Sequence, residues 1–331
     1  MGWDGDETEL HVVSIPMRVP FRGVLHREAL LLRGPAGWGE FSPFLEYDDA
    51  EASRWLAAAV EAAWHGWPAP VRERIPVNAT VPAVPAAEVA GILARFPGCT
   101  TAKVKVAEAG QALADDLDRV AAVRDVLGAA GRIRVDANGG WTVRAATDAL
   151  TALAPYGLEY AEQPCATVEE LAELRVALAR ARVDVLVAAD ESVRKAEDPL
   201  LVARAGAADV IVLKVAPLSG VLPALAVAEQ CGLPVVVSSA LDTAVGIRAG
   251  VALAAALPSL PFACGLATGS LMSADVAELH VVSGALPVGD VVPDPERLAA
   301  LAAPPDRRAW WLDRSRRCRE LLGELPHGPG G

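Results

Sequence analysis

Five short runs between residues 102 and 214 read AKVKV (102–106), IRVD (133–136), LEYAE (158–162), VLVAAD (185–190) and VIVLK (210–214). Most of the runs of this kind in the chain are continuous stretches of Val, Ile, Leu and Ala without alternation, as expected when both faces of a sheet are covered. Amphipathic helical segments separate the runs, for example at 115–127, 143–153 and 168–179. Strands that alternate with helices in this way predict parallel β/α units.

Three more runs of the same kind, at 77–81, 235–239 and 262–267, bring the number of predicted strands to eight. Eight β/α units in about 200 residues predict an α/β fold, a modified β/α (TIM-like) barrel. The chain before residue 75 differs, because alternating apolar residues over 10–19, a Gly/Pro-rich turn at 34–39 and a helix from Asp48 or Asp49 to Trp64 follow one another. This order predicts a small α+β domain, which is called the capping domain below.

We therefore expect three parts: a capping domain over residues 1–74, the barrel with the active site over 75–286, and a C-terminal segment over 287–331. The last segment is rich in Pro and Arg and loses the β/α pattern. We expect Trp310 and Trp311 to pack back on the capping domain, and the Pro-Gly-Gly tail to be mobile.

A charged residue stands at the end of each of the five runs quoted above. These residues are Lys105, Asp136, Glu162, Asp190 and Lys214, and successive ones are separated by 31, 26, 28 and 24 residues. Each interval is one β/α unit, so all five side chains are expected at the same mouth of the barrel. The carboxyl ends of the strands are where barrel enzymes keep their catalytic groups.

Three carboxylates within a few ångström repel one another unless a cation neutralises them. Oxygen ligands without His or Cys favour a hard ion, Mg²⁺ more than Zn²⁺, and the five histidines form no ligand-spaced pair. Such a site would hold a substrate carboxylate, acidify the neighbouring C–H bond and stabilise an enediolate. The two lysines suit general acid/base roles, because a nearby cation lowers the pKa of a lysine.

The order of these side chains, a Lys-x-Lys motif at 103–105 and then Asp, Glu, Asp and Lys on the next four strands, resembles the enolase superfamily, in its muconate-lactonizing-enzyme subgroup. The resemblance spans essentially the whole chain, capping domain included. Three further segments support it: VPFRG (19–23), GWGEFSP (37–43) and SSALDT (238–243). Enzymes of that superfamily use a Lys or His base together with Mg²⁺.

The resemblance implies a role for each matching residue. Asp136, Glu162 and Asp190 would bind Mg²⁺. Lys105 would take the proton beside the substrate carboxylate and return it to the departing hydroxyl, while Lys214 would stabilise the enediolate from the opposite face. It also implies supporting or substrate contacts from four polar residues: Lys103, Asn138, Ser238 and Ser239. Arg22, in the capping domain, is a candidate for the second carboxylate of the substrate.

Within the subgroup, the chain is most similar to enzymes of menaquinone biosynthesis that dehydrate 2-succinyl-6-hydroxy-2,4-cyclohexadiene-1-carboxylate to o-succinylbenzoate. The resemblance thus implies a Mg²⁺-dependent hydro-lyase. The seventh run ends without His, which disfavours mandelate-racemase-like chemistry. Three alternatives stay open: a racemase of N-succinylamino acids using both lysines as bases, a metal-free Schiff-base aldolase using Lys214, and an inactive barrel that serves as a binding module.

Composition restricts the partners. The 331 residues are 53% hydrophobic, enough for a large core, and carry a net charge of −12, which argues against nucleic acid and anionic membranes. Five scattered cysteines and an acidic N-terminus indicate a reduced, cytoplasmic protein without a signal peptide. The uncharged stretch 249–274 is interrupted by Pro258 and Pro261, so we expect a buried helix, turn and strand in a soluble protein. The expected partner is a small-molecule dicarboxylate.

Overall fold

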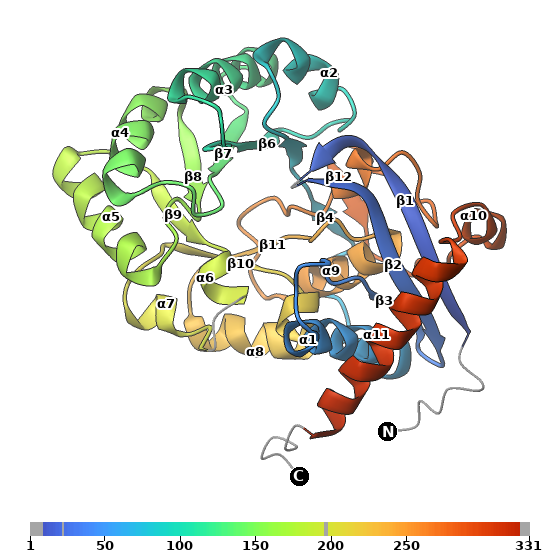
Figure 1. The fold of residues 1–331 in the computed structure, drawn as a ribbon. Helices are drawn as coiled ribbons and strands as arrows, with labels where there is room; N and C mark the ends of the chain where they lie inside the picture. Colours follow the sequence, from blue (N-terminus) through green and yellow to red (C-terminus); the bar gives the residue numbers. More distant parts are fainter. Residues whose placement is uncertain (1–8, 22, 195–197, 325–331) are drawn as a thin grey trace.

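The computed structural model describes residues 9–21, 23–194 and 198–324. Its largest sheet has seven parallel strands that curl around a common axis (Figure 1). In spatial order they are β5 (Ala79–Val81), β6 (Thr101–Lys105), β7 (Arg132–Asp136), β8 (Leu158–Glu162), β9 (Leu186–Ala189), β10 (Val210–Leu213) and β11 (Val235–Val237). Spatial order follows chain order, as expected for consecutive β/α units.

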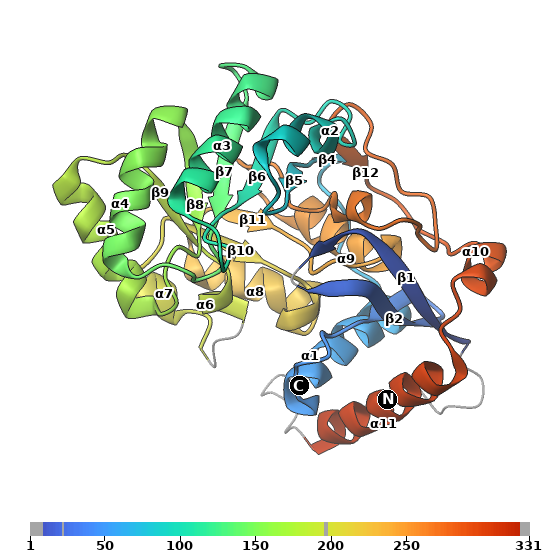
Figure 2. The ribbon, with the colours of Figure 1, turned by 45° about the horizontal axis from the view of Figure 1, so that its top comes forward.

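Helices cover the outer face of this sheet (Figures 1 and 2). They are α2 (Val89–Leu93), α3 (Leu113–Leu127), α4 (Val143–Leu153), α5 (Val168–Ala181), α6 (Glu191–Arg194), α7 (Leu201–Arg204), α8 (Val221–Cys231) and α9 (Ala244–Ala256). Four short helical turns also occur in this part of the chain: η2 (Ala86–Glu88), η3 (Ala154–Tyr156), η4 (Ala216–Leu218) and η5 (Thr268–Leu271). Thr167 begins α5 with a capping box, in which its hydroxyl accepts from Glu170 N at 3.2 Å.

The eighth predicted strand, at 262–267, is not a regular strand, and the prediction was wrong in this detail. Cys264 and Gly265 instead form single parallel bridges to Val77 and Ser238, and so close the sheet between its two edges. The Ser238 side chain approaches Gly265 closely here, since a Cβ atom at Gly265 would lie 2.5 Å from Ser238 Oγ. A glycine in such a short segment weakens a ladder while permitting this approach.

The N-terminal residues form a separate antiparallel sheet of β1 (Leu10–Phe21), β2 (Val24–Gly34) and β3 (Gly37–Phe41). The predicted turn at 34–39 is shorter than expected, because β3 begins at Gly37. Asp48 caps helix α1 (Asp49–Val60), accepting from Glu51 N at 2.8 Å. The helix continues directly into the π-helical turn η1 (Glu61–His65).

The C-terminal helix α11 (Pro305–Glu324) packs along α1 (Figures 1 and 2). The Trp311 ring meets the Phe41 ring edge-on, with centroids 5.7 Å apart, and Trp311 Nε1 donates to Glu28 Oε2 at 2.9 Å. Three small elements complete the fold. β4 (Arg74–Pro76) pairs with β12 (Ala285–Pro287), and α10 (Pro295–Ala300) lies beside β1 and precedes α11. The first and last parts of the chain therefore pack against each other and form one unit.

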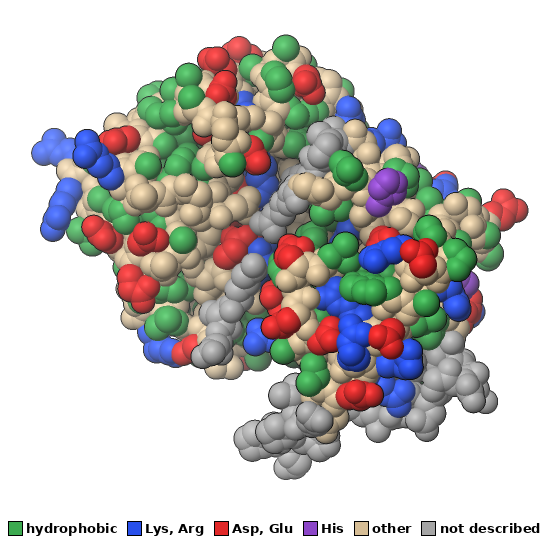
Figure 3. Space-filling model, in the orientation of Figure 1, with side chains coloured by type: hydrophobic (Ala, Val, Ile, Leu, Met, Phe, Trp, Pro, Cys, Tyr) green, Lys and Arg blue, Asp and Glu red, His purple; other side chains and the backbone are tan. Residues whose placement is uncertain are grey.

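Figure 3 shows neighbouring acidic and basic side chains over α1 and α11. One such pair joins Arg317 Nε to Asp49 Oδ2 at 2.6 Å. In the part of the chain that the structure describes, none of the helices combines the length and apolar character that a membrane crossing needs. The predicted mobile tail, residues 325–331, and the candidate Arg22 lie outside the described residues.

Candidate active site

The strand ends of the curled sheet bring five of the predicted site residues to one mouth. Parallel register places Lys105 opposite Asp136, and Asp136 opposite Glu162, across β6, β7 and β8. Asp190 and Lys214 each follow the last residue of the next two strands, β9 and β10. All five side chains are buried. Their charges consequently act on one another with little screening by solvent.

Each lysine of this group is paired with a carboxylate. Lys105 Nζ lies 2.6 Å from both Asp136 Oδ2 and Asn138 Oδ1. Lys214 Nζ lies 2.6 Å from Asp190 Oδ2. The two proposed acid/base lysines therefore contact different carboxylates.

Lys103 is the third ammonium group of the cluster. Its Nζ lies 2.7 Å from Glu162 Oε1 and 3.0 Å from Asp136 Oδ2. Burial opposes its charge, but these two carboxylates raise the pKa of Lys103 above its usual value. Lys103 therefore stays charged and neutralises two acids. It shares the Asp136 Oδ2 atom with Lys105.

The acids respond to this setting in opposite ways. Burial, and then the charge of Asp136, raise the pKa of Glu162 to about 7. Burial also opposes ionisation of Asp190, but Lys214 and Arg194 outweigh it and lower the pKa of Asp190 below its usual range. The carboxyl group of Glu162 thus needs more positive charge than the surrounding side chains provide.

Arg194 is a site residue that the sequence reasoning missed. Its guanidinium donates to Asp190 Oδ1 at 3.1 Å, to Glu191 Oε1 at 2.6 Å and to the Tyr47 hydroxyl at 3.2 Å. The arginine is buried on α6, one helical turn after Asp190. The spacing of four residues between an acid and an arginine was the available signal, since such pairs face one another on a helix.

The other predicted contact residues lie around the same mouth. Asn138 adopts a left-handed backbone with φ of +47°, a conformation that Asn tolerates, and this turns its side chain toward Lys105. Ser239 Oγ donates to Gly265 O at 2.9 Å. Ser238 lines the cavity on the same side.

Several of these residues line a cavity of about 30 Å³. Its wall is formed by both units of the chain, and the residues that carry charged or hydroxyl groups are Thr80, Lys103, Lys105, Asp136, Arg194, Lys214, Ser238, Ser239 and Thr268. Phe44 and Leu241 add apolar surface. A cavity of this size has room for only a few water molecules.

The donor chemistry of the site fits a hard divalent cation. Asp136, Glu162 and Asp190 offer oxygen atoms only, and all three are buried. Among the described residues, no three Asp, Glu, His or Cys side chains are grouped closely enough to hold one ion. The lysine ammonium groups stand against the carboxylates instead. A metal would have to replace these contacts.

Two family models match the chain. An enolase C-terminal domain-like model matches residues 86–292, and an enolase N-terminal domain-like model matches residues 12–63. Solved structures show the same fold. The muconate lactonizing enzyme from Pseudomonas putida covers 89% of this chain and 99% of its own, with a TM-score of 0.72 and 20% identity. The L-Ala-D/L-Glu epimerase from Bacillus subtilis covers 86% of this chain and 96% of its own, with a TM-score of 0.71 and 23% identity.

Curated relatives are much more similar in sequence. The o-succinylbenzoate synthase of Mycobacterium leprae (strain TN) is 62% identical over 95% of this chain and 92% of its own. That of Mycolicibacterium smegmatis (strain ATCC 700084 / mc(2)155) is 61% identical over 95% of this chain and 96% of its own. The chain therefore belongs to the enolase superfamily and, within it, to the family of the o-succinylbenzoate synthases.

Proposed function

We propose that this chain dehydrates 2-succinyl-6-hydroxy-2,4-cyclohexadiene-1-carboxylate to o-succinylbenzoate, as a cytoplasmic lyase of menaquinone biosynthesis. One observation carries the proposal. Lys105 and Lys214 contact different members of a buried carboxylate cluster in a chain about 60% identical to o-succinylbenzoate synthases. A substrate between the two lysines would face a base on one side and a cation on the other.

The proposed metal is Mg²⁺, and its ligands would be Asp136, Glu162 and Asp190. When bound, Mg²⁺ would supply a Lewis acid that makes the C–H bond beside the substrate carboxylate more acidic. The high pKa of Glu162, raised by burial to about 7, supports the proposal, because such a carboxyl group gains most from added positive charge.

Lys105 is the proposed base. Its Nζ takes the proton as the C–H bond breaks, and the electron pair moves toward the carboxylate group, which becomes the enediolate. The electron pair then returns to form a double bond in the ring as the C–O bond to the hydroxyl group breaks, and Lys105 returns the proton so that water leaves. The ring becomes aromatic, which makes the reaction favourable. Lys103 supports a neutral Lys105, because the two ammonium groups share Asp136 Oδ2 and repel one another when both are charged.

Lys214 is the proposed electrostatic stabiliser. Its contact with Asp190 Oδ2, at 2.6 Å, favours the charged form that this role requires. The Schiff-base aldolase alternative is disfavoured by the relatives about 60% identical to the chain, which are o-succinylbenzoate synthases. We further propose that Asn138 orients Lys105, that Lys103 neutralises the acids, and that Ser238 and Ser239 contact the succinyl part of the substrate.

The proposed domain division is 1–74, 75–286 and 287–331, with the first and last parts forming a capping unit over the barrel mouth. The matched ranges 12–63 and 86–292 support it. So does the presence of Phe44 in the cavity wall beside barrel residues. A small cavity between the units is compatible with opening of the capping unit for substrate entry.

A direct assay tests the proposed function. Purified chain with Mg²⁺ is mixed with the cyclohexadiene substrate, and the aromatic product is followed by its ultraviolet absorbance. We expect turnover by the wild type and none above background when Lys105 is replaced by Arg. A wild type that binds Mg²⁺ but produces no o-succinylbenzoate would reject the proposal.

N-succinylamino acid racemase is the second candidate. The contact of Lys105 and Lys214 with different carboxylates supports it, because racemisation needs a base on each face of the substrate. The test is deuterium exchange into an N-succinylamino acid from D₂O, starting from each enantiomer. Exchange from both enantiomers, without dehydration of the cyclohexadiene, would favour this candidate over the first.

A further inference from the structure

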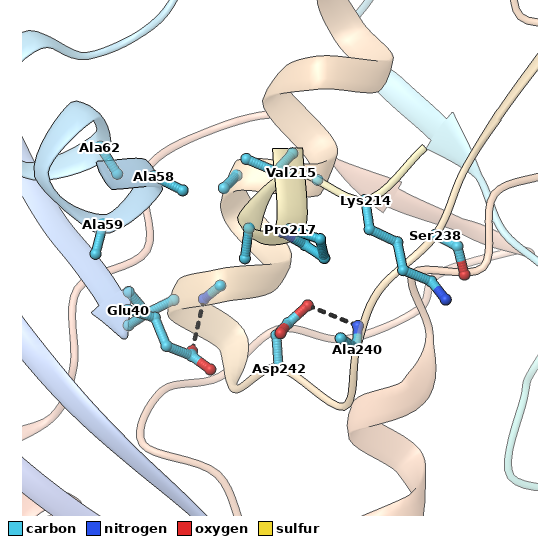
Figure 4. A pocket seen from close by; sticks show the side chains of 15 residues that line it. Glu40, Ala58, Ala59, Ala62, Lys214, Val215, Pro217, Ser238, Ala240 and Asp242 are labelled. Carbon is cyan, nitrogen blue, oxygen red and sulfur yellow. Dashed lines mark hydrogen bonds between the residues drawn. The ribbon is translucent and has the colours of Figure 1, made fainter. Parts of the chain in front are cut away.

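Two sequence segments far apart in the chain, GWGEFSP (37–43) and SSALDT (238–243), are joined by buried polar contacts. The first belongs to the sheet β1–β3 and the turn after it, and the second follows barrel strand β11. Figure 4 shows Glu40 on one side of a pocket, with Lys214 and Ser238 on the other and Asp242 between them. The proposed reaction assigns a role only to Ser238 and Ser239 of the second segment. It gives no reason for the buried contacts between the two segments.

Arg27, on β2, makes the most extensive of these contacts. Its Nε donates to Leu241 O at 2.9 Å, and its Nη2 donates to Ala240 O at 3.2 Å and to Ser42 Oγ at 2.9 Å. Nη2 also donates to Ser42 O. The guanidinium carbon lies 4.8 Å from the centre of the Phe44 ring, and the side chain is only 3% exposed. One capping-unit arginine thus binds two consecutive carbonyl groups of the barrel segment.

The segment that Arg27 binds has an unfavourable backbone. Leu241 has φ of +62°, in the left-handed region. For a residue with a branched side chain, this conformation costs about 1–2 kcal/mol and persists only where surrounding contacts impose it. The Leu241 side chain is buried in the capping-unit core and also forms part of the cavity wall. Its carbonyl group is fixed by Arg27 from the other side.

Glu40 fixes the other end of the same segment. Its carboxylate accepts from Thr243 Oγ1 at 2.6 Å, Thr243 N at 3.1 Å and Gly246 N at 2.9 Å. These donors form the first turn of α9, where an anion is stabilised by the free amide groups. A Cβ at Gly246 would lie 2.8 Å from Glu40 Oε2, so glycine permits this approach. Ser42 Oγ links Glu40 to Arg27, since it donates to Glu40 Oε1 at 2.7 Å and accepts from Arg27.

The capping unit fixes the carbonyl groups of residues 240 and 241, directly after Ser238 and Ser239 of the barrel mouth. Barrel contacts hold the two ends of the segment, through Ser238 N to Leu213 O at 2.9 Å and Ser239 N to Gly265 O at 3.2 Å at one end, and through Val245 N to Thr243 Oγ1 at 3.2 Å at the other. We propose that Arg27 is a positioning residue for substrate specificity, which holds segment 238–243 so that Ser238 and Ser239 face the succinyl part of the substrate. This inference rests on the proposed function for the identity of the ligand.

The test compares Arg27→Met with Arg33→Met. Both arginines lie on β2, but Arg33 is exposed and pairs with Glu9 at 3.1 Å, so its variant is the matched control. Hydrogen exchange followed by mass spectrometry reports on the segment directly and needs no assumption about the reaction. We expect peptides covering 238–243 to exchange at least about tenfold faster in Arg27→Met than in the wild type. The exchange rate of peptides from α4 should not change. The control should behave like the wild type.

Kinetics and binding separate a positioning role from a purely structural one. In Arg27→Met we expect KM for the cyclohexadiene substrate to rise about tenfold, with kcat within about threefold of the wild type. With Mg²⁺ present, affinity for o-succinylbenzoate should fall about tenfold, while affinity for benzoate, which lacks the succinyl chain, should not change. Arg27→Lys should be intermediate, because it restores charge and donors without the planar fork. It serves as the test variant if Arg27→Met does not fold.

Two results would overturn the inference. One is unchanged exchange over 238–243 with unchanged KM. The other is faster exchange throughout β1–β3 with equal losses for both ligands, which would show that Arg27 only stabilises the capping unit. A wild type without dehydratase activity would instead reject the proposed function. In that case the exchange comparison still decides whether Arg27 holds the segment.

Discussion

Arg119 Nη1 donates to the main-chain carbonyl oxygen of Lys105 at a distance of 2.8 Å. The same side chain donates to Val84 O at 2.6 Å and pairs with Asp116 Oδ1 at 2.9 Å. Asp116 in turn accepts from Ala107 N at 3.0 Å. Helix α3 therefore holds the end of strand β6, which carries the proposed base, through two buried side chains.

Replacing Arg119 by Met should lower the free energy of unfolding by about 3 kcal/mol, because it leaves Asp116 and two carbonyl groups buried without their partner. Urea denaturation measures the loss. Arg144→Met is the control, since the Arg144 side chain is 94% exposed on α4. If Arg119→Met lowered the free energy of unfolding no more than Arg144→Met does, a stabilising role for the buried pair would be contradicted.

Lys105→Arg should abolish dehydration while keeping the charge next to Asp136. An arginine side chain stays protonated at neutral pH and cannot accept a further proton, so kcat should fall by about 10²–10⁴. Steady-state kinetics give kcat, and binding of o-succinylbenzoate with Mg²⁺ checks that the site is intact. Activity near the wild-type value would exclude Lys105 as the base.

Lys214→Arg should affect the two candidate reactions differently. Dehydration needs only a cation at this position, so we expect this variant to keep far more activity than Lys105→Arg. Racemisation needs a base there, so exchange from one enantiomer of an N-succinylamino acid should be lost. If dehydration by the two arginine variants were equally slow, Lys214 would have to act as more than a charge.

Removal of divalent cations should stop the reaction. We expect no turnover in EDTA, full recovery with excess Mg²⁺, and a higher thermal midpoint when Mg²⁺ is added. At a metal concentration about 100 times Kd, binding should stabilise the fold by about 2.7 kcal/mol. Asp190→Asn should weaken both effects. Unchanged activity in EDTA, checked by metal analysis of the sample, would contradict a metal-dependent mechanism.

The cysteines should react slowly in the folded protein. Burial raises the pKa of all five thiols, for example that of Cys99 to about 11 and that of Cys264 to about 11. Because only the thiolate reacts, alkylation by iodoacetamide should be slow at pH 7 and accelerate toward pH 9. Mass spectrometry of native and urea-denatured samples compares the rates. Rapid native labelling of Cys165, Cys231, Cys264 or Cys318 would contradict the burial of that thiol.

The sequence predicted the barrel because apolar runs and helical segments each have a local signature. Helix 143–153 was predicted with the bounds that the structure has, and the charged strand ends meet because parallel register is regular. The assignment of catalytic and metal-binding roles at these ends stays a prediction. The eighth predicted strand is not a regular strand. The sheet closes at this segment because Gly265 leaves room for the Ser238 side chain, and the apolar composition of the segment does not reveal this.

The buried arginines were the main residues that sequence reasoning missed. Arg27 is satisfied chiefly by main-chain carbonyl groups, and any residue type can present a carbonyl group. Its partners are chosen by tertiary structure, so no pattern of side chains in the sequence marks it. Arg119 and Arg194 each have an acid at helical spacing, Asp116 and Asp190, but their further partners lie elsewhere in the fold.

Helix α11 also has a consequence for how the molecule is made. Trp311 and Cys318 complete the core that contains Phe41 and Trp55, although more than 200 residues separate α1 from α11. During synthesis, β1–β3 and α1 leave the ribosome first. The apolar surface that α11 covers in the folded protein stays exposed while the entire barrel is translated. The earliest segment to be made is thus the last to finish folding, and we expect nascent chains stalled before residue 305 to depend on chaperones.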